Sequence, residues 1–156
     1  MLVVDGVLLN NRSQVSPRAW LRPDHDRTSP MQSPVTIMMV DDDERGRRIT
    51  SRILRDEGYM VIEARSAEHA LEQLPDAGEV QVVLADIAMP GGMNGVELGE
   101  KVQEAEPGRR VVLMSGYDRL FPKWGEMGAR FPLLIKPFTA DQLLRQMHDV
   151  LKGGMH

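Results

Sequence analysis

The chain has 156 residues, of which 42% are hydrophobic and 4% aromatic, and its formal net charge is −4. This length allows one domain with a tail, and the core must be built from aliphatic side chains and methionine. The absence of cysteine excludes disulfides and thiolate chemistry, and no apolar run is long enough to span a bilayer. The acidic balance argues against a nucleic-acid partner. We therefore expect a cytoplasmic protein with neither a membrane nor a nucleic-acid partner.

The first segment, residues 1–34, differs in composition from the rest of the chain. Prolines interrupt it repeatedly, and its serines, asparagines and arginines follow no sustained period. Such a segment cannot bury enough apolar surface to offset the entropy of ordering. We predict a disordered N-terminal tail over residues 1–34. An alternative is that Met31 is the natural start of the protein.

Five short apolar runs alternate with five helical patterns over residues 35–152. The apolar runs are rich in β-branched residues, which is typical of strands buried on both faces of a parallel sheet. The predicted strands are Val35–Val40, Tyr59–Ala64, Val80–Ala85, Arg110–Met114 and Phe131–Ile135.

The helices between these strands show start and stop signals. Asp43 and Ser66 are suited to cap the first two helices, and Thr139 with Gln142 forms a capping box before the last one. The third helix is predicted over Val96–Glu106. The fourth, Asp118–Arg130, is weak because it contains a proline and two glycines.

Strands that alternate with helices require a parallel sheet with right-handed crossovers. The fold class is therefore α/β. Five strands fit a flavodoxin-like, doubly wound (βα)5 three-layer sandwich with the sheet order 2-1-3-4-5. The domain is predicted over residues 35–152, and residues 153–156 form a frayed C-terminus.

A carboxylate, hydroxyl or ammonium group follows four of the five predicted strands, and the second strand contributes nothing comparable. Asp41 and Asp42 follow the first strand, Asp86 the third, Ser115 the fourth and Lys136 the fifth. In the predicted order these four strands are neighbours, so their carboxyl ends meet at one edge of the sheet.

This set of side chains fits phosphoryl transfer. Crowded carboxylates repel one another unless a cation lies among them, and oxygen ligands suit Mg²⁺. A hydroxyl and an ammonium group could bind the oxygens of a phosphoryl group, and an aspartate can be its covalent acceptor. Each residue also has an ordinary structural role, since aspartate and serine are common in turns.

Four motifs in this order resemble the receiver domain of two-component response regulators: IMMVDDDE, LADIAMPGGMNGVEL, VVLMSGY and LLIKPF. The resemblance covers Val35–Leu151 and implies that Asp86 is the phosphoacceptor. It further implies a switch hydroxyl on Ser115 and a phosphoryl-pairing role for Lys136. The Mg²⁺ ligands that it implies are Asp41, Asp42, Asp86 and the backbone carbonyl of Ala88.

By the same resemblance, the protein is a stand-alone, non-enzymatic switch of a two-component system or phosphorelay. A histidine kinase or a histidine phosphotransfer protein would supply the phosphoryl group. An unidentified protein target would bind the face made by the fourth helix, fifth strand and fifth helix. We expect a monomer, with a phosphorylation-dependent dimer as the alternative. The arginines of the first helix, among them Arg47, are expected to form a solvated face.

The sequence departs from the family's pattern in three places. The loop after Asp86 is one residue longer than usual, and Leu133 stands where the family often has an aromatic switch residue. The third is the weak fourth helix, which predicts an output face that orders on phosphorylation. Tyr117, two residues after Ser115, is predicted to shield the phosphoryl group from water.

Two other functions compete with the receiver hypothesis. The first is a degenerate receiver that acts as a constitutive protein-binding module. The second is a haloacid-dehalogenase-type phosphatase with Asp41 as the nucleophile, because Asp41-x-Asp43 after a buried strand imitates the motif of that family. This enzyme would leave Asp86 without a role.

Overall fold

The computed structural model describes residues 2–9, 34–116 and 130–153. The predictions for Tyr117 and for most of the fourth helix lie outside these residues. The strands are β1 (Leu2–Val4), β2 (Val7–Leu9), β3 (Thr36–Val40), β4 (Met60–Ala64), β5 (Val82–Asp86), β6 (Arg110–Ser115), β7 (Leu133–Ile135) and β8 (Phe138–Thr139). The helices are α2 (Glu44–Asp56), α3 (Ala67–Gln73), α4 (Gly95–Ala105) and α6 (Ala140–Gly153), with a short 3-10 helix, η2 (Leu74–Asp76).

The central sheet has five parallel strands in the order β4-β3-β5-β6-β7. Numbered along the domain, this is the order 2-1-3-4-5, so the predicted topology is confirmed. The register aligns the ends of the strands: Val40 lies opposite Ala64 and Ala85, and Asp86 lies opposite Met114. Consequently the residues that follow β3, β5, β6 and β7 gather at one edge.

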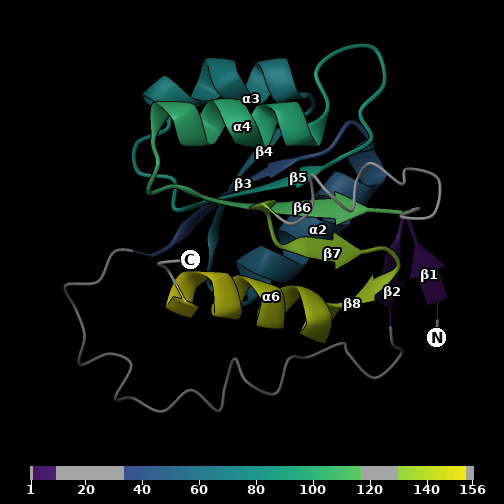
Figure 1. The fold of residues 1–156 in the computed structure, drawn as a ribbon. Helices are drawn as coiled ribbons and strands as arrows, with labels where there is room; N and C mark the ends of the chain where they lie inside the picture. The colour runs from purple at the N-terminus through teal and green to yellow at the C-terminus, as the bar shows by residue number, and fades with distance from the viewer. Residues whose placement is uncertain (1, 10–33, 117–129, 154–156) are drawn as a thin grey trace, which may run out of the picture.

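Helices cover both faces of the sheet and make three layers (Figure 1). Successive residues of a strand point to opposite faces, so β3 divides its side chains between two apolar clusters. Met38 and Val40 join the cluster under α3 and α4, whereas Ile37 and Met39 join the cluster under α2 and α6. This confirms the α/β three-layer sandwich.

The predicted caps are present at the ends of the helices. The Asp43 side chain accepts a hydrogen bond from the Gly46 N–H, and Ser66 accepts one from the His69 N–H. Thr139 and Gln142 exchange the two hydrogen bonds of a capping box. Helix α4 begins at Gly95, one residue before the prediction, because Asn94 caps it.

Residues 2–9 are ordered, which differs from the predicted disordered tail, whereas the prediction for residues 10–33 lies outside the described residues and stays a prediction. Strands β1 and β2 form an antiparallel hairpin, and β2 pairs in parallel with β8 near the other end of the chain. The turn consists of Asp5 and Gly6, whose φ angles of 50° and 88° are the positive values that a two-residue type I′ turn requires. An Asp-Gly pair between two apolar runs is typical of such a hairpin, and this signal was present in the sequence.

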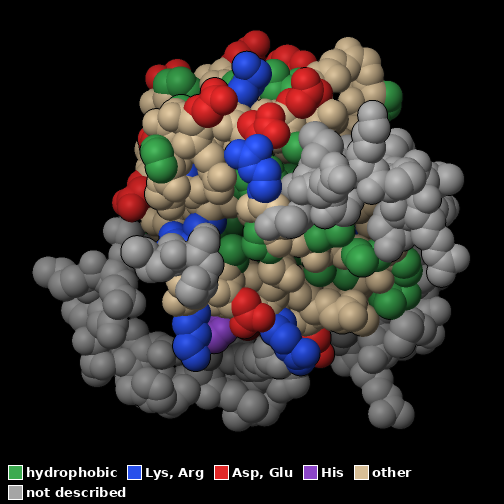
Figure 2. Space-filling view, viewed as in Figure 1, with side chains coloured by type: hydrophobic (Ala, Val, Ile, Leu, Met, Phe, Trp, Pro, Cys, Tyr) green, Lys and Arg blue, Asp and Glu red, His purple; other side chains and the backbone are tan. Residues whose placement is uncertain are grey.

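Figure 2 shows one face of the molecule, with charged side chains over α3 and α4 and again over α6. Hydrophobic side chains lie between these two charged regions, at the level of the sheet. Ile135 on edge strand β7 is 50% exposed. Among the described residues, no helix has the length and apolar character needed to cross a membrane.

Candidate functional site

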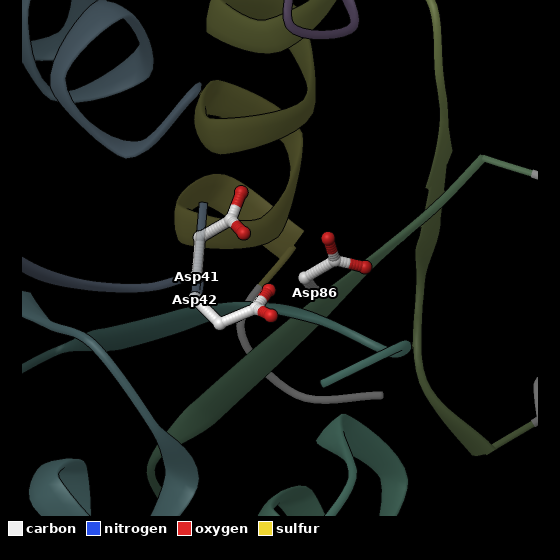
Figure 3. Close-up of side chains that lie close together, drawn as sticks. All are labelled: Asp41, Asp42 and Asp86. Carbon is white, nitrogen blue, oxygen red and sulfur yellow. The ribbon is translucent and has the colours of Figure 1, made fainter. Parts of the chain in front are cut away.

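Three carboxyl groups lie together at the carboxyl edge of the sheet. Asp41 and Asp42 follow β3, and Asp86 ends the neighbouring strand β5. Figure 3 shows these side chains around one space, and one oxygen of each lies within 4.8 Å of the others. Asp41 is buried and Asp42 is exposed. The structure thus brings together the three acidic side chains that the sequence predicted as metal ligands.

The ammonium group of Lys136 lies beside two of these carboxylates. Its Nζ is 2.9 Å from Asp86 Oδ2 and 3.5 Å from Asp41 Oδ2. Burial alone would lower the pKa of Lys136, but the attraction of Asp41 and Asp86 outweighs it and raises that pKa. Lys136 therefore stays charged at neutral pH.

Asp41 is the most enclosed of the three aspartates, with 1% of its surface exposed. Its Oδ1 accepts a hydrogen bond from the Asp43 N–H at 3.0 Å. Burial raises the pKa of Asp41 to about 6, although Lys136 and the Asp43 N–H oppose this effect. The charged form of Asp41 is therefore costly here, and a bound cation would relieve that cost.

Asp86 is held at the end of its strand by close backbone contacts. Its Oδ1 accepts a hydrogen bond from the Ala88 N–H at 3.1 Å, and the Ile87 N–H donates to the Met114 carbonyl. Gly95 at the start of α4 packs directly against the Asp86 carbonyl, where a Cβ would have no room. These contacts fix the backbone of Asp86 while 9% of the residue remains exposed.

The remaining predicted site residues lie at the same edge. Ser115 ends β6 and is 8% exposed, and its carbonyl accepts a hydrogen bond from the Lys136 N–H at 2.8 Å. Ala88 is exposed in the loop after Asp86. The peptide bond between Lys136 and Pro137 is cis.

Two residues around the site were missed by the sequence analysis. Arg47 is not part of a solvated face: its Nη1 donates to the Asp41 carbonyl at 2.8 Å, and its Nε pairs with Glu63. Glu68 on α3 accepts a hydrogen bond from the Met93 N–H at 2.9 Å and so holds the longer loop after Asp86. Nothing in the sequence marked either contact, because each depends on the direction of a long side chain.

The donor set fits Mg²⁺. The ligand atoms are carboxylate oxygens, and among the described residues no sulfur or imidazole ligand joins the cluster. Mg²⁺ binds through a few carboxylates and keeps several waters, which suits a site with one exposed aspartate. Asp41, Asp42 and Asp86 would hold the ion.

The fold and the site define an α/β protein with a cluster of three aspartates and a lysine at the carboxyl edge of its sheet. Comparison with known proteins identifies the family: the family model described as "Response regulator receiver domain" matches residues 37–148. The chain therefore belongs to the response regulator receiver family.

Individual relatives agree with this family. The chain is 30% identical over 129 residues to "Sensor kinase CckA" of Brucella abortus. The alignment covers 81% of this chain and 14% of that protein. It is 32% identical over 111 residues to "Nitrogen assimilation regulatory protein NtrX" of Azorhizobium caulinodans, covering 69% of this chain and 24% of the relative. The chain thus spans a small part of these relatives.

A solved structure has the same fold over nearly its whole length. A CheY-like receiver domain protein from Methanospirillum hungatei superposes with a TM-score of 0.70 at 30% identity, covering 78% of this chain and 97% of that one. Another relative, 33% identical over 121 residues, is "Cyclic di-GMP phosphodiesterase" of Thermotoga maritima, of which the chain covers 32%.

Proposed function

We propose that this chain is a phosphorylation-activated signalling switch that accepts a phosphoryl group on Asp86. The observation that carries the proposal is the ion pair of 2.9 Å between Lys136 Nζ and Asp86, beside two further aspartates. A lone carboxylate needs no such surroundings. A carboxylate that receives a charged phosphoryl group needs positive charge nearby, which Lys136 and a cation held by the aspartates would supply.

The proposed transfer step uses the side chains gathered at this edge. An oxygen of Asp86 attacks the phosphorus of a phosphohistidine on a partner protein. The P–O bond forms as the P–N bond breaks, and the imidazole nitrogen keeps the electron pair and takes up a proton. Lys136 and Ser115 bind oxygens of the transferred group. Mg²⁺, when bound, supplies positive charge that neutralises the phosphoryl oxygens.

The donor that we propose is a histidine kinase or a histidine phosphotransfer protein. We also propose that the phosphorylated protein acts by binding a protein target rather than by catalytic turnover. The exposed Ile135 on edge strand β7 supports an output surface that includes β7 and α6. A monomer is the proposed resting state.

The geometry disfavours the phosphatase hypothesis. Asp41 would be the nucleophile of such an enzyme, yet it is 1% exposed and uses Oδ1 to accept the Asp43 N–H. Asp86 is the more accessible carboxylate and has the closer lysine. Sustained turnover of an aryl phosphate would nevertheless revive that hypothesis.

The test is intact-mass analysis after incubation with acetyl phosphate, with and without Mg²⁺. Wild type should gain one phosphoryl group only with Mg²⁺, and Asp86→Asn should gain none. Asp76→Asn removes an exposed carboxylate on η2 and is the matched control. If wild type shows no adduct, beryllofluoride titration by NMR separates a short-lived phosphate, which still shifts site resonances, from a constitutive binding module, which does not.

A further inference from the structure

The N-terminal hairpin is built into the domain rather than attached to its surface. Strand β2 pairs with β8 through Val7 opposite Phe138 and Leu8 opposite Thr139. Val7 is 1% exposed and belongs to the apolar cluster under α2 and α6, together with Phe138 and Leu143. The hairpin therefore extends the core on one face of the sheet, next to the carboxyl edge (Figure 1).

The turn of the hairpin contacts the lysine of the site. The Gly6 carbonyl accepts a hydrogen bond from the Phe138 N–H at 3.0 Å. A Cβ on Gly6 would lie 2.9 Å from Cδ and 3.3 Å from Cγ of Lys136, so the aliphatic part of that side chain lies directly on the glycine backbone. The same turn contacts α2, because a Cβ on Gly46 would lie 3.2 Å from the Asp5 carbonyl.

Three parts of Lys136 are thus held by contacts. Its N–H donates to the Ser115 carbonyl, its aliphatic part lies on Gly6, and its Nζ lies between Asp86 and Asp41. A lysine side chain has four flexible bonds, and their rotamer freedom opposes a fixed position of the ammonium group. A support under the middle of the side chain removes part of that freedom before the phosphoryl group arrives.

We propose that Gly6 is a positioning residue for phosphoryl transfer: the hairpin turn holds the Lys136 side chain so that its ammonium group stays beside Asp86. The inference rests on the proposed function of Asp86. Only glycine suits the position, because φ is +88° and because any Cβ would displace Lys136. Residues 2–9 therefore belong to the functional unit.

The primary test is the rate of Asp86 phosphorylation by acetyl phosphate with Mg²⁺ in Gly6→Ala. We expect about a tenfold decrease, because a misplacement of about 1 Å can cost this much or more. Gly78→Ala is the matched control, since Gly78 also has a positive φ of 73° but has open space where a Cβ would be added. This control should phosphorylate at the wild-type rate. A wild-type rate in folded Gly6→Ala would overturn the proposal.

A double-mutant cycle separates positioning from a general structural effect. Lys136→Ala should lower the rate by itself, and adding Gly6→Ala to it should change the rate by less than about twofold if Gly6 acts through the lysine. An equal decrease in both backgrounds would contradict the proposal. If Gly6→Ala does not fold, Val7→Ala replaces it in the same cycle, since it weakens the packing of the hairpin in the core and leaves Gly6 unsubstituted.

An NMR measurement keeps this inference distinct from the proposed function. The side-chain signals of Lys136 can be followed without phosphate. In wild type and in Gly78→Ala the chemical shifts of these signals should be dispersed, as for an ordered side chain. In Gly6→Ala the chemical shifts should be averaged over several rotamers. If wild type is never phosphorylated but this difference is seen, the proposed function fails and the support of Lys136 by Gly6 remains. If the lysine signals are identical in all three proteins, the positioning role fails.

Discussion

The central sheet has buried or half-buried charges at both ends of its strands, the amino edge where the strands begin and the carboxyl edge where they end. The two edges balance these charges differently. At the amino edge, the Arg109 side chain is 8% exposed and has two partners, the Val80 carbonyl and Glu106, each at 2.9 Å. At the carboxyl edge, Asp41, Asp42 and Asp86 lie together, and Lys136 pairs with two of them, Asp41 and Asp86. Matched charges hold the structure together, whereas a surplus of one sign creates a place for a ligand of the other.

Removing the lysine should produce the largest effect. Lys136→Met would leave two nearly buried carboxylates without their cation, and we expect the metal-free protein to lose about 3 kcal/mol of unfolding free energy. Urea denaturation in EDTA measures this loss, with Lys101→Met on the exposed face of α4 as the control. Mg²⁺ should restore part of the stability. Equal stability of Lys136→Met and wild type would mean that the two edges do not differ in charge balance.

Removing the charge of Asp41 at the same edge should instead raise the unfolding free energy of the metal-free protein. Burial raises the pKa of Asp41 to about 6, so its charge destabilises the folded metal-free protein at neutral pH. We expect Asp41→Asn to gain about 2 kcal/mol of unfolding free energy in EDTA. This is less than the pKa shift of Asp41 implies, because Lys136 loses a partner. Wild type should gain stability on adding Mg²⁺, by about 2.7 kcal/mol at a hundredfold excess over Kd, and the variant should gain much less. A variant that is weaker than wild type in EDTA would refute this account.

The amino edge should respond to mutation in stability alone. Arg109→Ala leaves the buried Val80 carbonyl without its donor, so we expect a loss of about 1 to 2 kcal/mol of unfolding free energy. Acetyl phosphate should still phosphorylate the folded variant at the wild-type rate. Arg109→Lys keeps the charge and should lose less. A slower phosphoryl transfer in Arg109→Ala would show that the two edges are coupled.

The sequence predicted the carboxyl edge because its signals are local and repeat along the chain. Four of the five apolar runs are followed at once by a carboxylate, hydroxyl or ammonium group. Because parallel strands end at the same edge, Asp41, Asp86 and Lys136 were expected to converge. The contact between Gly6 and Lys136 could not be predicted in this way. Its local signal, Asp5–Gly6, was present, but the partner strand β8 lies near the other end of the chain, and no periodic pattern reports such a pairing.

The smallest predicted effect is a pH dependence that belongs to the carboxyl edge. The pKa of Asp41 is about 6 in the folded protein against an ordinary value of 3.8, so the folded state takes up a proton before the unfolded chain does. Metal-free stability from this group therefore rises as the pH falls through 6, by about 1 kcal/mol between about pH 7 and pH 5. The raised pKa of Lys136 acts only at alkaline pH.

Urea denaturation in EDTA at these two pH values, on wild type and Asp41→Asn, isolates this contribution. Because the two proteins differ only at Asp41, the difference between their pH responses reports the ionisation of Asp41 together with its coupling to the neighbouring charges. Mg²⁺ requires the charged carboxylate and should oppose the gain in wild type at low pH. Parallel pH responses in EDTA would show that Asp41 does not change its protonation between these two pH values, and the raised pKa of Asp41 would then be refuted.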